Sequence, residues 1–137
     1  MLVALDSNVF IAALSPKEAH SLNAQKLIRS IAEGNHRAVA SSLVYGEVLT
    51  VSTDSKAIDL EDFFVHINNL TTVSANDSIC LEAGRLRSVQ GSKLKLPDAI
   101  HLVTAIHNNA NLFVTNDEIL SKMAKKLIPT KLLSDWV

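Results

Sequence analysis

The sequence predicts an α/β protein, a three-layer α/β/α sandwich in which a parallel sheet of about five strands lies between two layers of helices. Short apolar runs alternate along the chain with longer segments whose apolar residues recur at helical spacing. Gly and Pro number only 4 and 3, which favours a helix-rich fold with few tight turns. We find no repeat, linker or low-complexity segment, so one domain is expected over residues 1–137.

Short apolar runs are expected to form the strands, because runs of this kind are typical of strands that are buried on both faces. The expected strands are residues 2–6, 37–41, 71–74, 112–117 and 130–134. The pattern at 71–74 is the weakest of these. The first and fourth strands each end in an aspartate, so acidic side chains are expected at the ends of two strands.

Segments with helical periodicity separate the strands. The expected helices are residues 7–14, 19–33, 41–52, 59–70, 76–90, 97–110 and 118–126. Gly34 and Gly91 directly follow two of them, and glycine commonly ends a helix. Pro97 stands at a helix start, where its missing N–H costs nothing. Residues 53–58 form the most loop-like stretch.

Composition excludes several classes of protein. The formal net charge is -1, so a nucleic-acid partner would require a local basic surface. The single cysteine, Cys80, allows neither an internal disulfide nor a cysteine-rich zinc site. The N-terminal residues lack a basic segment, and Asp6 interrupts their apolar run. We therefore expect no signal peptide, no membrane span and a cytoplasmic location.

Asp6 and Asp117 are candidate ligands, because parallel strands end at one edge of a sheet and ligands bind there, near the switch in strand order. Each aspartate also has a structural explanation. It can cap the helix that follows it, since an aspartate side chain accepts hydrogen bonds from the first free N–H groups of a helix. For either residue alone, the two explanations remain open.

Glu47 and Asp98 extend the acidic set. Glu47 falls within the apolar stripe of its helix, four residues after Leu43 and three after Val44. A carboxylate on that side needs a cation, a lysine or arginine partner, or a route to solvent at the edge of the stripe. Asp98 lies in the first turn of its helix, where the helix dipole favours a negative charge, and at the flank of the apolar stripe.

Together the four acids point to a metal site. Carboxylates that converge at one sheet edge repel one another, and a divalent cation removes that repulsion. Oxygen ligands of this kind suit Mg²⁺ or Mn²⁺. The chemistry that needs such a site is phosphoryl transfer or phosphodiester hydrolysis.

These residues also carry a resemblance. The segments "ALDSNVFIAAL" (4–14), "ASSLVYGEVL" (40–49), "LPDAIHLVTA" (96–105) and "LFVTND" (112–117) resemble the four acidic motifs of the PIN domain in order, spacing and flanking residues. The resemblance covers nearly the whole chain. In its size and its lack of appended domains, the chain resembles the VapC-type toxins of bacterial and archaeal toxin–antitoxin pairs.

The resemblance implies a Mg²⁺- or Mn²⁺-dependent endoribonuclease. The metal-binding and catalytic carboxylates would be those of Asp6, Glu47, Asp98 and Asp117. Thr115 matches the hydroxyl residue that supports such a site, and Asn8 matches a polar position after the first aspartate. Many relatives carry a further acid two residues after the last aspartate. Here that position is Ile119, with Glu118 beside it.

The chain between Ala83 and Pro97 contains no acid and leads directly to Asp98. Its basic residues are the candidate RNA contacts: Arg85, Arg87, Lys93 and Lys95. The alternative is an ordinary solvated helix end and loop. His101 falls opposite the apolar stripe of its helix, so we expect it on the surface.

The resemblance implies three partners: an RNA substrate, a small antitoxin protein that blocks the site, and a second copy of the chain in a homodimer. The apolar residues from Phe10 to Ile31, together with Phe63 and Phe64, are candidates for the protein contacts.

Three other functions are alternatives to the nuclease toxin, and the first two remain open. A PIN-type nuclease could process RNA without being a toxin. A non-catalytic α/β interaction module could use the acids only as helix caps. A nucleotide-binding domain is disfavoured, because neither a G-x-G-x-x-G segment nor a Walker A segment is present.

Overall fold

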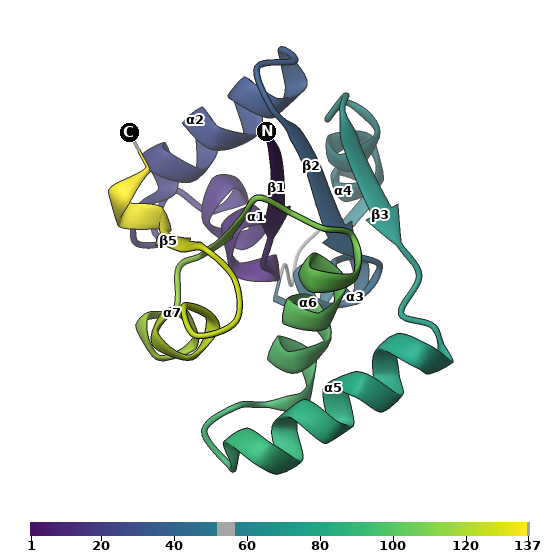
Figure 1. The fold of residues 1–137 in the computed structure, drawn as a ribbon. Coiled ribbons are helices and arrows are strands. Elements are labelled where there is room, and N and C mark those ends of the chain that lie inside the picture. Colours follow the sequence, from purple (N-terminus) through teal and green to yellow (C-terminus); the bar gives the residue numbers. More distant parts are fainter. Residues whose placement is uncertain (52–56, 137) are drawn as a thin grey trace.

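The computed structural model describes residues 1–51 and 57–136. A five-stranded sheet forms the centre of the molecule (Figure 1). Its strands are β1 (Leu2–Leu5), β2 (Arg37–Ser41), β3 (Leu70–Val73), β4 (Leu112–Thr115) and β5 (Thr130–Leu132). Every pairing is parallel and the strand order is β3-β2-β1-β4-β5. The parallel α/β/α fold predicted from the sequence is confirmed.

Each predicted strand is present, with small differences at the ends. β2 has the predicted bounds, and β3 lies one residue earlier than predicted. β4 ends at Thr115, so Asp117 lies beyond the strand and caps the next helix. β5 ends at Leu132, and a 3-10 turn, η1 (Leu133–Asp135), follows it.

The helices of the described residues also lie close to the predicted ranges. They are α1 (Ser7–Leu14), α2 (Ser21–Ala32), α3 (Leu43–Val51), α4 (Ala57–Val65), α5 (Asp77–Gln90), α6 (Leu96–His107) and α7 (Glu118–Ala124).

The α4 region shows the largest difference from the prediction. α4 begins at Ala57, inside the predicted loop, and residues 53–56 of that loop lie outside the described residues. The helix ends at Val65 instead of Leu70. Asn69 adopts φ 68°, a left-handed conformation that asparagine tolerates, and there the chain turns into β3. Ile67 is buried in the core between the two elements.

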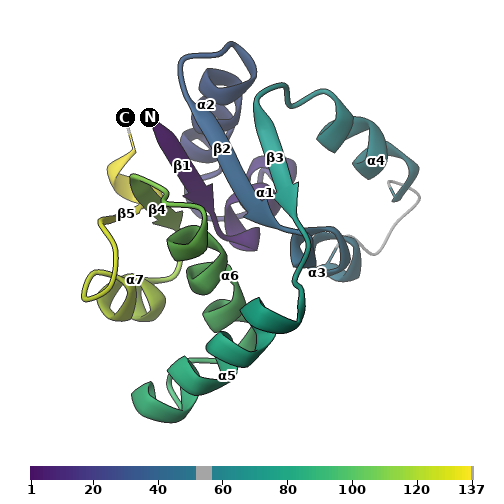
Figure 2. The same cartoon turned by 45° about the vertical axis from the view of Figure 1, so that its right-hand side comes forward.

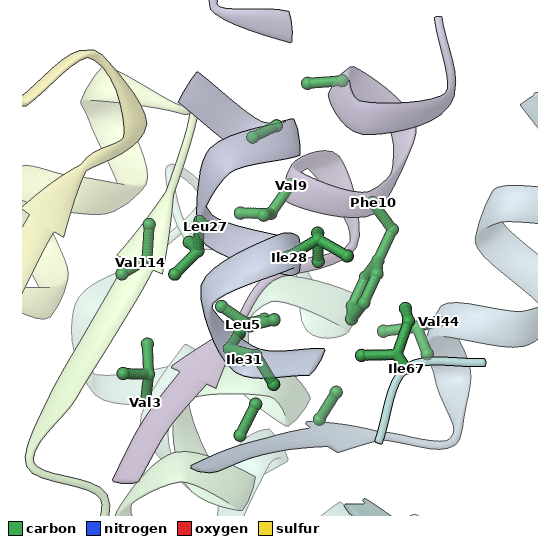
Figure 3. Close-up of a cluster of buried hydrophobic side chains, with 14 of the residues drawn as sticks. Val3, Leu5, Val9, Phe10, Leu27, Ile28, Ile31, Val44, Ile67 and Val114 are labelled. Atoms are coloured by element: carbon green, nitrogen blue, oxygen red, sulfur yellow. The ribbon is translucent and has the colours of Figure 1, made fainter. Parts of the chain in front are cut away.

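Two apolar layers cover the sheet, because successive strand residues face opposite sides. Val3 and Leu5 of β1 face α1 and α2, whereas Ala4 faces the layer of α5, α6 and α7. Figure 1 shows α6 in front of the strands with α1 and α2 behind them, and Figure 2 shows the same layers from another side. The side chains of the first layer interdigitate around Leu5 and Ile31 (Figure 3).

The apolar residues of the early helices are core, not surface. Phe10, Leu27 and Ile31 are fully buried, so the prediction that residues from Phe10 to Ile31 form a partner surface is wrong for them. Leu22 is exposed. Phe63 and Phe64 are partly buried against the same core. Among the described residues, no helix is long and apolar enough to cross a membrane.

The strand order fixes where a ligand can bind. The chain adds β2 and β3 on one side of β1, then returns to add β4 and β5 on the other. The switch in strand order therefore lies between β1 and β4, whose carboxyl ends leave a crevice in sheets of this type. Asp6 follows β1 and Asp117 follows β4, so both predicted aspartates lie at this position.

Candidate active site

Asp6 is buried at the carboxyl end of β1, and it caps α1. One carboxylate oxygen, Oδ1, accepts from the backbone N–H of Ser7 at 2.8 Å. The other, Oδ2, accepts from the Thr115 hydroxyl at 2.8 Å. Burial raises the pKa of Asp6, and the negative charge of Glu47 raises it further, against the lowering effects of His101, Thr115 and the Ser7 N–H.

Thr115 and Asn8 join the ends of β1 and β4. The Thr115 hydroxyl, besides donating to Asp6, accepts from the Asn8 amide at 3.3 Å and from the backbone N–H of Asp117 at 3.1 Å. The Asn8 side-chain oxygen accepts from the Asn116 N–H at 2.9 Å. This network fixes the two strand ends relative to each other, and with them the aspartates that follow. No separate sequence pattern indicates this role of Asn116.

Asp117 is the N-cap of α7. Its Oδ1 accepts from the backbone N–H groups of Ile119 and Leu120 at 2.9 and 3.1 Å. The helix-cap explanation is therefore correct for this residue, as it is for Asp6. The cap holds the carboxylate in place at the sheet edge, so capping and a ligand role are compatible. Glu118 and Ile119 are both exposed in the first turn of α7.

Asp98 lies in the first turn of α6 and is partly buried. Its pKa is raised to about 6, first by burial and then by the negative charges of Asp6 and Asp117. Glu47 adds a smaller effect in the same direction, and His101 opposes it. Because these charges act on one carboxyl group, the structure brings all four predicted acids into one electrostatic cluster.

His101 is buried, so the prediction of a surface position is wrong. Its Nε2 donates to Glu47 Oε1 at 2.6 Å and lies 3.8 Å from Asp6 Oδ1. The prediction failed because α6 is buried almost all round: every residue from Ala99 to Ala105 is buried. A helix lined on every side by apolar, small or threonine residues is typical of a core position, and that pattern was the available signal.

The pKa of His101 is raised above its ordinary value. Burial is the largest single effect and acts to lower this pKa. The hydrogen bond to Glu47 and the charges of the neighbouring acids act in the opposite direction, and their sum is larger. The imidazole is thus held in a strongly negative environment. Glu47 itself lies on α3, and about a third of its side chain is exposed.

The donor set fits a hard divalent cation, because carboxylate oxygens are the ligands that Mg²⁺ and Mn²⁺ prefer. Among residues 1–51 and 57–136, no lysine or arginine forms an ion pair with any of the four acids. The acidic charges that add to the effect of burial on the pKa of Asp98 are opposed by His101, and a cation would offset them further. Within the same residues, no group of three or more potential ligands is already close enough to hold a metal.

The four basic candidates are exposed. Arg85 and Arg87 lie on α5, and Lys93 and Lys95 lie in the segment that connects α5 to α6. Lys95 is the N-cap residue of α6, three positions before Asp98. Figures 1 and 2 both place α5 at the end of the molecule towards which the arrows of β1, β2 and β3 point. The basic segment thus lies at the same end of the sheet as the acids.

The Asp98 carboxyl group makes the stability of the fold depend on pH. Its pKa of about 6 lies above the ordinary value of 3.8, so the native state binds this proton more tightly than the unfolded chain does. Its contribution to stability therefore falls as pH rises from about 4 to about 6, and it stays low above that. Asp98→Asn should raise the free energy of unfolding by about 1–2 kcal/mol at pH 7.5, a range reduced for solvent screening.

Urea unfolding of the wild type and the variant at pH 7.5 and near pH 4 measures this difference in the free energy of unfolding. The difference should vanish near pH 4. Asp77→Asn is the matched control, because Asp77 occupies the first turn of α5 and is exposed. A variant that is no more stable than the wild type at pH 7.5 would show that neither burial nor the neighbouring acids destabilise the ionised Asp98 carboxylate.

Comparisons with known proteins agree with this fold. The VapBC2 complex of Rickettsia felis, bound to a promoter DNA fragment, superposes with a TM-score of 0.70 at 21% identity, covering 96% of this chain and 98% of that one. VapC20 of Mycobacterium tuberculosis, described as a sarcin-ricin loop cleaving toxin, superposes with a TM-score of 0.71 at 14% identity. The match covers 90% of this chain and 95% of that one. VapBC-1 of Haemophilus influenzae superposes with a TM-score of 0.67 at 17% identity, covering 98% of this chain and 100% of that one.

At these identities the structural matches show a shared fold. No curated protein matches the sequence. The PIN domain family, however, matches residues 3–126, which is most of the chain and includes all four acids. The chain therefore belongs to the PIN domain family.

Proposed function

We propose that this protein is a metal-dependent endoribonuclease and the toxin of a toxin–antitoxin pair. The observation that carries the proposal is the cluster of four carboxylates at the switch in strand order, where no lysine or arginine of the described residues pairs with them. Membership of the PIN domain family supports the nuclease activity, and the similarity to VapC20 and the VapBC complexes supports the toxin role.

The four acids would bind the metal ion, and Thr115 would support them. Asp6, Glu47, Asp98 and Asp117 would hold Mg²⁺ or Mn²⁺. When bound, such an ion supplies a nucleophilic hydroxide and stabilises the charge that develops on the phosphate. Thr115 orients Asp6 through its 2.8 Å hydrogen bond and meets the backbone N–H of Asp117, so it holds two of the ligands at a fixed spacing.

The basic residues of α5 and the following segment would contact the phosphates of RNA. Cationic side chains beside an acidic metal centre counter the repulsion between the acids and an incoming phosphate backbone. We propose this role for Arg85, Arg87, Lys93 and Lys95. The cytoplasm is the location that an RNA substrate implies.

The protein partner would be a small antitoxin, and we expect a homodimer as well. Between α3 and α4 lies a cleft of about 470 Å³, lined by Tyr45, Leu49, Leu60, Glu61, Phe64 and Val65. Tyr45 and Val65 are exposed, and Phe64 packs against Tyr45 at a ring-centroid distance of 5.0 Å. An apolar surface of this kind supports the antitoxin proposal, and it includes Phe64 from the predicted pair.

Removing one carboxylate should abolish cleavage without unfolding the protein. Asp98→Asn should lower the rate of cleavage of a single-stranded RNA by about 100-fold or more in Mn²⁺, because the asparagine amide cannot neutralise the ion. Asp6→Asn and Asp117→Asn should do the same, and each retains a capping side chain. Chelation with EDTA should stop the wild-type reaction.

Asp77→Asn serves as the control and should cleave within about 2-fold of the wild type. Cleavage that persists in EDTA, or in all three variants, contradicts the proposal. If calorimetry also finds no Mn²⁺ binding to the wild type, the non-catalytic interaction module becomes the better description.

Arg87→Ala and Lys93→Ala should affect substrate binding and leave the chemical step intact. We expect KM to rise roughly 3- to 10-fold and kcat to stay unchanged, since phosphate contacts are lost and the metal ligands are not. The dependence of KM on salt should also become shallower. Lys122→Ala, at the exposed end of α7, is the matched control. Unaltered KM in both variants would mean that this segment does not bind RNA.

A toxin should stop growth. Induced expression of the wild type, and of Asp77→Asn, should arrest bacterial growth, whereas Asp98→Asn should not. Coexpression of the small antitoxin that we propose should restore growth in the strain that expresses the wild type. Normal growth, with the purified protein still cleaving RNA, would favour the RNA-processing alternative over the toxin role.

A further inference from the structure

His101 contacts the acid cluster without being one of its carboxylates. Its side chain is fully buried, and Nε2 lies 2.6 Å from Glu47 Oε1 and 3.8 Å from Asp6 Oδ1. The residue is part of α6, which is buried on nearly every side, and it stands one helical turn after Asp98. The helix thus presents a metal-ligand candidate and an imidazole to the same cluster.

Glu47 needs a hydrogen-bond partner that fixes its carboxylate if it is to serve as a ligand. It is carried by α3. Its side chain is about a third exposed and has three rotatable bonds, so solvent alone would leave its carboxylate free to turn. Within the described residues, the hydrogen bond from His101 is the only one that the Glu47 carboxylate makes.

We propose that His101 is a positioning residue that holds the Glu47 carboxylate at the acid cluster through a hydrogen bond donated by Nε2. This inference rests on the proposed function, because its purpose is to prepare Glu47 as a ligand for the divalent ion. Nε2 is already engaged by Glu47, so the imidazole acts through the carboxylate instead of binding the ion itself.

The second ring nitrogen agrees with this assignment. Nδ1 of His101 is buried and has no hydrogen-bond partner in the described residues. An unpaired buried acceptor is less costly than an unpaired buried N–H, so a single imidazole hydrogen belongs on Nε2. A doubly protonated ring also donates from Nε2. In either state Nε2 donates to Glu47, so the positioning role does not depend on titration.

Two substitutions separate positioning from packing. The side-chain amide of His101→Gln can place its nitrogen where Nε2 stands, whereas that of His101→Asn reaches only as far as Nδ1. We expect His101→Asn to weaken Mn²⁺ binding about 10-fold or more, and His101→Gln to remain within about 3-fold of the wild type. Calorimetry of the Mn²⁺ complex measures both, at a temperature where thermal melting shows each variant folded.

His107→Asn is the matched control. His107 lies on the same helix and also bonds a glutamate, Glu82, at 2.6 Å, but that pair is exposed and apart from the acids. Its Mn²⁺ affinity should equal that of the wild type. Equal Mn²⁺ affinity in His101→Asn, or equal weakening in both His101 variants, would overturn the positioning role and leave a packing role.

A measurement on the metal-free protein keeps the test independent of the proposed function. The ¹⁵N spectrum of the imidazole ring should show a hydrogen on Nε2, and its signal should move in Glu47→Gln. A bare Nε2 would overturn the inference even if the histidine variants failed to fold. Wild-type protein that neither binds Mn²⁺ nor cleaves RNA would contradict the proposed function, and the ring spectrum would still decide the role of His101.

Discussion

The burial of the Asp6 carboxylate at the end of β1 is the constraint on which the rest of the site depends. A carboxylate removed from water requires hydrogen-bond donors and a compensating charge. The Ser7 N–H and the Thr115 hydroxyl provide the donors. Because Thr115 is on β4 and Ser7 begins α1, satisfying Asp6 also fixes how the central strands and the first helix meet.

The compensating charge is only partly present. His101 is the basic group closest to Asp6, and it also serves Glu47. Burial, and after it the remaining negative charge, raises the pKa of Asp98 to about 6. If these acids had only a structural role, a lysine or arginine would be expected beside them, because buried charges are usually paired. The imbalance is what distinguishes a site for a cation from a set of helix caps, although Asp6 and Asp117 are caps as well.

Much of the fold could be predicted, because strands buried on both faces produce short apolar runs that differ plainly from helical periodicity. The ends of elements were harder to place. α4 ends early since Asn69 turns the chain and Ile67 is needed in the core, which are tertiary demands that a helical pattern does not reveal. The convergence of the four acids followed from their positions after strands and on flanking helices.

The role of His101 could not be derived in the same way, because helical-wheel reasoning assumes one solvated face. α6 has almost none, so a polar residue opposite the apolar stripe is buried and must find a partner on another element. That partner, Glu47, is 54 positions away in the sequence. Pairing over such a distance depends on how α3 and α6 are placed about the sheet, which no local pattern records.

We propose that these carboxylates share one divalent ion. Anomalous diffraction from crystals soaked in Mn²⁺ can locate that ion. We expect a manganese peak bounded by the side chains of Asp6, Glu47, Asp98 and Asp117 at the ends of β1 and β4. A well-ordered site without such a peak, with the acids turned towards lysine or arginine side chains, would contradict it.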